Sequence, residues 1–424
     1  MTDPQRSAAP AMWPLRQVLA LAPVRRLWTA QIVSILGDLL ALYGLLSAIS
    51  FRMHGTAMQV SLVSLFYLAP LAVIAPFAGV LVDRWDARRT MIASDCIRAV
   101  FALGLVFAPT LPLMYAAIFL ISAVSCLFIP AQSVAIRALV PREGLLSANA
   151  LMQQAMQLAR LASPALAAAL VAWIGPSICF YLDAASFVVS ALLISAIRLP
   201  AAAPLPQGIP GMPPRSTRGV LDDLREGIRF LFTHATLSFV VVSMALGTFV
   251  VSCFAPLLAI YLRDQVHAGV IAYGLLSTVS TVGMIAATVA VVRLSKRATS
   301  QQLVFAGLAG IGAGIAFVAL VHFAPLVAIG SFAMGFGMSL VVAPAQTLLQ
   351  QETPFAMMGR VSSSTMSLLS ISQVLGLLVC GTAAEAVGAR KVFFICAALL
   401  LALAAFGLAR ISMAAPRAVS SELE

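Results

Sequence analysis

Long apolar runs joined by short polar connections follow one another along almost the whole chain. About twelve of these runs are long enough for a membrane-crossing helix, which takes about 20 apolar residues. They occupy residues 27–51, 57–82, 90–109, 111–136, 148–172, 177–197, 237–261, 270–292, 301–322, 325–349, 356–382 and 390–411. No large water-soluble domain fits between them. The pattern predicts an all-α membrane protein with twelve transmembrane helices.

The longest connection lies near the middle of the chain. It contains a stretch rich in Pro, Gly and Ala, residues 201–214, that is typical of a flexible linker. Residues 219–232 then place apolar side chains at helical spacing between charges, which predicts an amphipathic helix at the inner membrane surface. We expect an amino-terminal segment at residues 1–26 and a six-helix bundle at residues 27–198. A linker at residues 199–236, a second six-helix bundle at residues 237–411 and a tail at residues 412–424 should follow.

A short repeat agrees with this division into halves. The tripeptide from Pro130 to Gln132 recurs from Pro344 to Gln346, and each copy falls in the fourth predicted helix of its half. A duplication predicts two pseudo-symmetric bundles with a substrate cavity along their interface near the middle of the membrane. Gln132 and Gln346 are therefore candidates to line that cavity.

Composition agrees with a membrane location and adds an orientation. Of the 424 residues 61% are hydrophobic and 10% are charged, and the mean hydropathy is +1.02, which is incompatible with a water-soluble globule. Most of the 26 lysines and arginines fall in loops on the side of the amino terminus, so both termini are expected in the cytoplasm. The net charge of +11 therefore sets orientation and does not indicate nucleic-acid binding.

A charged run, GVLVDRWDARR at residues 79–89, interrupts the apolar pattern between the second and third predicted helices. Its carboxylates and guanidiniums cannot stay in hydrocarbon, so we expect a cytoplasmic loop here. The run resembles the loop signature G-x-L-x-D-R-x-G-R-R of the major facilitator superfamily, with Asp86 in place of the glycine and Ala87 in place of the first arginine. The matching residues are Gly79, Leu81, Asp83, Arg84, Arg88 and Arg89.

Further similarities point to the drug and siderophore exporter branch of that family, which includes macrolide efflux permeases and the enterobactin exporter. They lie at residues 28–38, 91–99, 130–132, 139–141, 148–150, 183–187 and 359–361. The resemblance implies an exporter that works by alternating access and is gated by the loop residues Gly79, Asp83, Arg84, Arg88 and Arg89. It also implies that Asp83 stabilises the outward-facing state by lying against the amino-terminal end of the eleventh helix.

Ionisable residues inside predicted helices are costly unless they face a cavity or a partner. Asp38 lies near the middle of the first helix and shares a polar face with Gln31 and Ser34. A similar stripe in the fifth helix consists of Gln153, Gln157 and Arg160. We interpret Asp38 as a site for a substrate cation or a proton, with Arg160 as the natural ion-pair partner and the polar neighbours as cavity lining. A packing role for Asp38 is the alternative.

Three more charges fall inside predicted helices. Asp95 and Arg98 stand three residues apart, a spacing at which they can pair, and we expect that pair to be mainly structural. Asp183 lies in the sixth helix, where it serves either folding or proton access. The arginine motif R-x-x-Q-G, which proton-coupled exporters carry in the fourth helix, is absent. Proton coupling is therefore an inference from the resemblance and from Asp38.

The sequence offers no residues for catalysis or for a cofactor. It contains no HxxxxD, GxSxG, HExxH or P-loop pattern, which argues against membrane-bound acyltransferases, hydrolases, zinc proteases and ATP-driven pumps. The six cysteines stand singly in apolar runs and the four histidines are far apart in sequence. We therefore expect packing cysteines, no disulfide and no metal site.

Together these observations predict a multi-pass secondary transporter of a bacterial-type inner membrane. It is expected to export an amphiphilic small molecule, such as a siderophore or a drug, by alternating access against proton entry. Its partners are then the cargo, protons and membrane lipid, with no nucleic acid and no cofactor, and we expect a monomer. A lysophospholipid flippase of the same fold and a transport-inactive membrane receptor are the alternatives.

Overall fold

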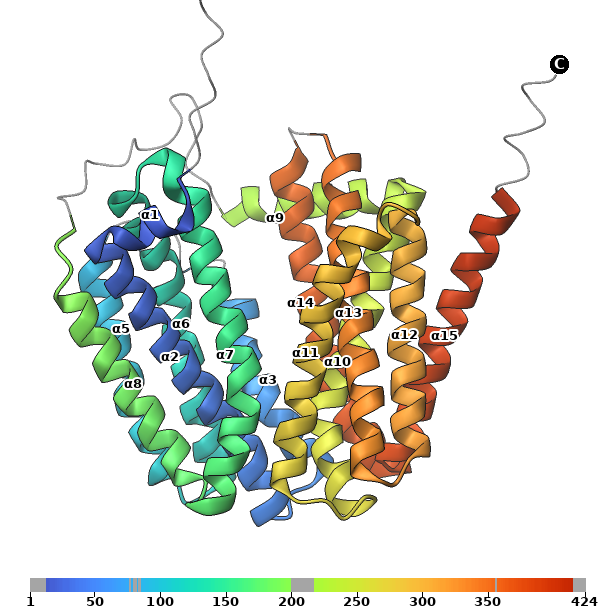
Figure 1. Ribbon diagram of the computed structural model, residues 1–424, viewed down its shortest axis with the longest axis horizontal. Coiled ribbons are helices and arrows are strands. Elements are labelled where there is room, and N and C mark those ends of the chain that lie inside the picture. The colour runs from blue at the N-terminus through green and yellow to red at the C-terminus, as the bar shows by residue number, and fades with distance from the viewer. Residues whose placement is uncertain are drawn as a thin grey trace, which may run out of the picture. The chain divides into compact units, whose positions relative to one another are not determined.

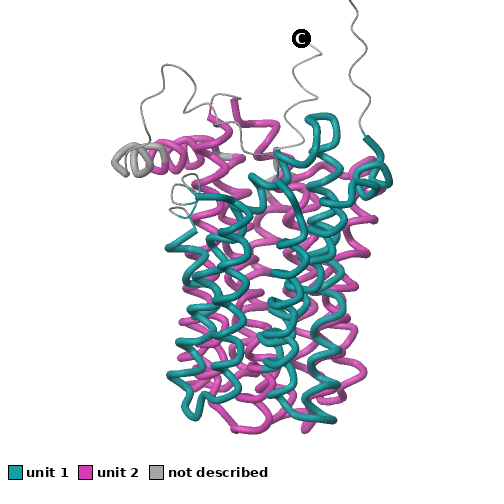
Figure 2. Tube along the Cα trace, turned by 90° about the vertical axis from the view of Figure 1, so that its left-hand side faces the viewer, with its two compact units in different colours: residues 1–44, 66–211 teal, residues 45–65, 212–424 magenta. Residues whose placement is uncertain are grey.

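The computed structural model describes residues 13–75, 78, 82, 85–199, 217–354 and 357–414, and nearly all of them are helical. The chain divides into two compact units (Figure 2). The first comprises Met1–Gly44 and Phe66–Gly211, and the second comprises Leu45–Leu65 and Met212–Glu424. The second unit therefore includes a segment from the early part of the chain.

Most helices belong to one unit, while α2 and α3 cross the division between the units. The helices of the first unit are α1 (Leu15–Ala20), most of α2 (Ala22–Ser47), the end of α3 (Ala57–Val73), α5 (Ala87–Val106), α6 (Leu111–Leu139), the 3₁₀ turn η2 (Arg142–Gly144), α7 (Leu145–Trp173) and α8 (Ser177–Ser195). Those of the second unit are the π-helix η1 (Ala48–Arg52), the start of α3, α9 (Thr217–Thr233), α10 (Ala235–Asp264), α11 (Val270–Leu294), α12 (Ser300–Leu320), α13 (Ala324–Glu352), α14 (Met358–Val387) and α15 (Ala389–Ala414) (Figure 1).

Among the described residues, ten helical segments are long and apolar enough to cross a membrane. Two further expected spans fall short of that criterion. The described part of α3 is only 17 residues long, and α5 is long enough but carries Arg88, Arg89, Asp95 and Arg98. The multi-pass, all-helical architecture is thus confirmed, and a count of twelve spans remains a prediction.

The amino-terminal end of α5 differs from the expected loop. The Asp86 carboxylate accepts a 2.7 Å hydrogen bond from the backbone N–H of Arg89 and so caps the helix. Because of this cap, α5 begins at Ala87, and Arg88 and Arg89 belong to its first turn. Two residues depart from the family signature, and both lie at the start of the helix: Asp86 caps it and Ala87 is its first residue.

Helices α2 and α8 approach each other closely at Gly37 and Gly44. A Cβ atom at Gly37 would lie 2.1 Å from Ser186 Oγ, and one at Gly44 would lie 2.7 Å from Cys179 Cβ. Such distances are far below van der Waals contact, so only glycine allows this separation. The close approach brings the residue after Gly37, Asp38, into the neighbourhood of the polar residues of α8.

Small residues also set helix distances in the second unit. On α12 and α13, a Cβ at Gly307 would lie 2.7 Å from the carbonyl oxygen of Gly337, and one at Gly314 would lie 2.7 Å from that of Gly330. Between α10 and α14, a Cβ at Gly376 would lie 2.5 Å from the carbonyl oxygen of Phe249. Tight backbone packing of this kind replaces hydrophobic driving force in a membrane bundle.

The amphipathic helix α9 lies crosswise to the long helices of its unit (Figure 1). Gly227 brings it against α14, where an added Cβ would lie 2.5 Å from the carbonyl oxygen of Arg360. The Ser364 hydroxyl donates a 3.1 Å hydrogen bond to the carbonyl oxygen of Leu224. Arg360 and Glu226 form an ion pair of 2.9 Å. The helix is thus attached to the first turns of α14.

Candidate functional site

The first unit contains a cluster of buried charges around Arg98 of α5. One guanidinium nitrogen, Nη1, lies 3.5 Å from Asp38 Oδ2 on α2 and 3.3 Å from Ser125 Oγ on α6. The other, Nη2, forms an ion pair with Asp95, one turn earlier on α5. The Arg98 side chain is 3% exposed, Asp95 is 0% exposed and Asp38 is 16% exposed. Asp38 is thus the most accessible member of these pairs.

Aromatic rings enclose the guanidinium of Arg98. Its central carbon lies 4.8 Å from the ring centre of Phe128 on α6 and 4.3 Å from that of Phe187 on α8. Both rings are nearly fully buried. Cation–ring contacts of this kind stabilise a guanidinium where water is excluded. Arg98 is therefore fixed by residues from four helices of the unit.

A third carboxyl group, that of Asp183 on α8, lies near the same charges. Asp183 is 0% exposed, and neither carboxyl oxygen has a hydrogen-bond partner in the described part of the chain. It interacts electrostatically with Asp38 and Arg98. A Cβ at Gly37 would lie 2.9 Å from its Oδ1, so the carboxyl rests against the backbone of α2. The cluster therefore combines three carboxyl groups with a single guanidinium.

The ion-pair partner of Asp38 differs from the one expected. We expected Arg160 of α7, but the guanidinium beside Asp38 is that of Arg98. Arg160 is exposed, and its electrostatic neighbours include Tyr43 and Tyr67. The expected pair of Asp95 and Arg98 is present. The helical spacing that predicted this pair could not reveal that the same guanidinium also reaches α2.

The glutamines expected to line a cavity behave differently from one another. Gln132 donates a 2.7 Å hydrogen bond to Gln31 and is 8% exposed, so these two amides satisfy each other. Ser34 is also buried. Gln153 and Gln157 line a depression of about 560 Å³ on α7, together with Ala150, Gln154 and Leu158. Gln346 on α13 is exposed.

Only part of the expected gating loop can be placed. Gly79, Asp83 and Arg84 lie outside the described residues. Arg88 donates to the carbonyl oxygens of Ile194, at 3.5 Å, and Ser195 at the end of α8. Arg26 donates a 2.7 Å hydrogen bond to the carbonyl oxygen of Ala196 just beyond them. Two guanidiniums thus satisfy the last carbonyls of α8, where positive charge is favourable. Arg89 is exposed.

Sequence reasoning missed Gly37, Ser125, Phe128 and Phe187 as parts of the site. Phe128 and Phe187 are indistinguishable in the sequence from the many apolar residues around them. Gly37 offered a usable signal, because it precedes Asp38 and recurs seven residues later as Gly44. That spacing marks one face of a helix and predicts a close neighbour there.

The sequence profile of the Major Facilitator Superfamily matches residues 27–376. The chain belongs to this family. It is 28% identical to the uncharacterized MFS-type transporter YfiS of Bacillus subtilis, over 88% of this chain and 90% of that protein. It is 26% identical to the multidrug efflux pump Tap of Mycolicibacterium fortuitum, over 80% of this chain and 84% of that protein. It is 22% identical to macrolide efflux protein A of Streptococcus pyogenes, over 89% of this chain and 93% of that protein.

A solved structure agrees with this assignment at the level of the fold. The nucleoside transporter NupG superposes with a TM-score of 0.70 at 13% identity, covering 91% of this chain and 98% of that one. The protein is therefore a multi-pass transporter of the Major Facilitator Superfamily, and its relatives include efflux pumps. The similarity to the exporter branch that the motifs suggested is confirmed.

Proposed function

We propose that this transporter exports an amphiphilic small molecule across a bacterial inner membrane by alternating access, in exchange for protons. The observation that supports this proposal most directly is the excess of buried carboxyl groups around one guanidinium. When Asp38, Asp95 and Asp183 are all ionised, the three carboxylates and the guanidinium of Arg98 together carry a net charge of −2 in low-dielectric surroundings. An unpaired charge there costs several kcal/mol. The cluster therefore favours states in which carboxyl groups carry protons.

Charge balance suggests a role for each residue. Arg98 and the fully buried Asp95 form a permanent pair. We take Asp183 as neutral, because its carboxyl forms neither an ion pair nor a hydrogen bond within the described residues. The cluster is then neutral when Asp38 is protonated. Loss of that proton creates a negative charge that a cationic amphiphile can balance. Asp38 would thus hold either a proton or the cargo, which is the exchange that an antiporter requires.

The names of the relatives support efflux as the direction of transport. A macrolide efflux protein and a multidrug efflux pump align with most of this chain. We therefore favour a drug-like amphiphilic cation as cargo. Lysophospholipid flipping makes a different prediction, because a lipid headgroup would be moved without dependence on the pH gradient.

Transport into inverted membrane vesicles tests the proposal. With an imposed pH gradient, the unaltered protein should accumulate a labelled macrolide or a fluorescent cationic dye. Asp38→Asn should abolish uphill accumulation, because a neutral amide can neither carry the proton nor balance the charge of a cationic cargo. Glu352→Gln is the matched control, since Glu352 is exposed at the end of α13.

Two results would reject the proposal. Gradient-driven accumulation by Asp38→Asn at the level of the control variant would make Asp38 a packing residue. Accumulation by the unaltered protein that ignores the pH gradient would leave facilitated diffusion or lipid flipping as the better account.

A further inference from the structure

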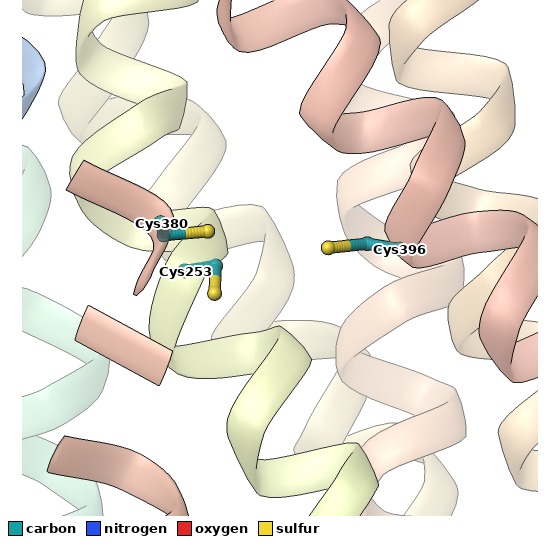
Figure 3. A group of neighbouring side chains, drawn as sticks. All are labelled: Cys253, Cys380 and Cys396. Atoms are coloured by element: carbon teal, nitrogen blue, oxygen red, sulfur yellow. The ribbon is translucent and has the colours of Figure 1, made fainter. Parts of the chain in front are cut away.

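Three cysteines that the sequence places far apart meet inside the second unit. Cys253 lies on α10, Cys380 on α14 and Cys396 on α15, and their sulfur atoms all lie within 4.8 Å of one another. In Figure 3 the side chain of Cys396 extends toward the other two, which lie next to each other. The three residues are 1%, 2% and 7% exposed. We call them the trithiol cluster.

The helix packing explains why the trithiol cluster forms. Gly376 lets the backbone of α14 approach the backbone of α10 at Phe249. One helical turn further along each helix, Cys380 follows Gly376 and Cys253 follows Phe249, so the two cysteines also lie side by side. The Cys253 thiol donates to the carbonyl oxygens of Gly376 and Phe249, each at 3.2 Å, which orients it toward α14. The third helix is aligned by Phe393, whose ring centre lies 5.4 Å from that of Phe254. Cys396 follows Phe393 by one turn.

The surroundings of the trithiol cluster are apolar. Among the described residues, the cations nearest to Cys396 in sequence are Lys391, which is exposed, and Arg390. Arg390 donates to the carbonyl oxygen of Ala319 at 3.0 Å and lies over the ring of Phe394. The ion pairs of the described residues involve other side chains. Because ionised thiols would have no counter-charge there, the resting cluster consists of neutral S–H groups.

From this arrangement we infer that Cys253, Cys380 and Cys396 form a binding site for the uncharged hydroxide of a trivalent thiophilic element, arsenous acid or its antimony counterpart. Three thiols of the protein replace three hydroxyl groups of the ligand. Three As–S bonds form, three S–H and three As–O bonds break, and three water molecules leave. No electron is transferred and no proton is released, so every species is uncharged.

Charge selects this ligand over the usual thiolate-bound metals. Three thiolates around a divalent ion such as Cd²⁺ carry a net charge of −1, and around Ag⁺ they carry −2, which is costly where nothing balances it. Geometry is compatible with three-coordinate binding. Bonds of about 2.3 Å at the angles of about 100° of a pyramidal three-coordinate atom place the sulfurs about 3.5 Å apart. Separations of up to 4.8 Å therefore need to close by at most about 1.3 Å. Binding ties α10, α14 and α15 together.

The test uses the purified full-length chain in lipid nanodiscs with arsenous acid as the probe. X-ray absorption at the arsenic edge should give three sulfur neighbours, and thiol counting after denaturation should find three of the six cysteines blocked. Changing any member of the trithiol cluster to Ser should weaken binding by at least about tenfold, which is about 1.4 kcal/mol. Ala at the same positions provides a second series without a new hydroxyl group to bury.

The controls are Cys126→Ser and Cys179→Ser, which remove buried thiols of the first unit and should leave arsenic binding unchanged. Arsenic affinity should be nearly constant between about pH 6 and pH 8, whereas Cd²⁺ binding releases protons and strengthens with pH. Two sulfur neighbours instead of three, unchanged binding in any variant of the trithiol cluster, or tighter binding of Cd²⁺ or Ag⁺ than of arsenous acid would overturn the assignment.

Discussion

Replacing Arg98 by Leu tests whether the buried guanidinium is what allows Asp95 to be ionised. Without it, Asp95 is fully buried with no cation beside it, and the folded protein must bind a proton that the unfolded chain does not. An unfolded aspartate has a pKa of about 3.9, and each pH unit corresponds to about 1.36 kcal/mol. The loss of stability should therefore be about 4 kcal/mol at pH 7 and about 1.5 kcal/mol at pH 5. The value at pH 7 agrees with the cost of breaking a buried ion pair.

The assay is unfolding in mixed micelles at several pH values, followed by circular dichroism. Arg160→Leu is the matched control, because Arg160 is an exposed arginine of the same unit and its removal should cost less than about 1 kcal/mol. In the double variant Arg98→Leu/Asp95→Leu, the additional pH dependence that Arg98→Leu introduces through Asp95 should disappear. A destabilisation by Arg98→Leu that does not change with pH, or that equals the control, would refute the argument.

Three further variants probe the packing. Gly37→Ala should cost about 1–3 kcal/mol of unfolding free energy because its Cβ would overlap Ser186, whereas Gly104→Ala, where nothing lies within 4 Å, should cost nothing. Arg263→Ala removes hydrogen bonds to the carbonyl oxygens of Ser50 and Gly55, so a cysteine introduced at Thr56 should react faster with an impermeant maleimide; an unchanged rate would contradict this. Gly227→Leu should detach α9 from α14 and speed proteolysis of the linker, unlike the exposed change Arg225→Leu.

The fold was largely predictable because hydrophobic length carries most of the signal in a membrane protein. Apolar runs of the right length indicate spans wherever they occur, and a described helix overlaps each of the expected ranges. The start of α5 was misplaced because its charged residues suggested a loop, while a single capping carboxylate, Asp86, was enough to begin the helix. The assignment of Leu45–Leu65 to the second unit had no sequence signal, since it depends on contacts between distant segments.

The candidate site was predictable only in its components. Helical spacing predicted the pairing of Asp95 with Arg98, and the cost of burying charge singled out Asp38 and Asp183. Which guanidinium would face Asp38 depended on the relative rotation of α2 and α5, and one-dimensional spacing contains no information about that rotation. The same limit applies to the trithiol cluster, whose members come from three helices and look like isolated packing residues in the sequence.

The contact between Gly37 and Asp183 also has a kinetic consequence. Asp183 is closed off where its carboxyl group and the Ser186 side chain pack against the backbone of α2 at Gly37, so water reaches it only when the helices separate. Collective movements of that kind take microseconds to milliseconds. A carboxyl group in open water exchanges protons far faster than that. If the transporter exchanges protons for cargo as we propose, the close contact between α2 and α8 would slow proton leakage through the protein while no cargo is being carried.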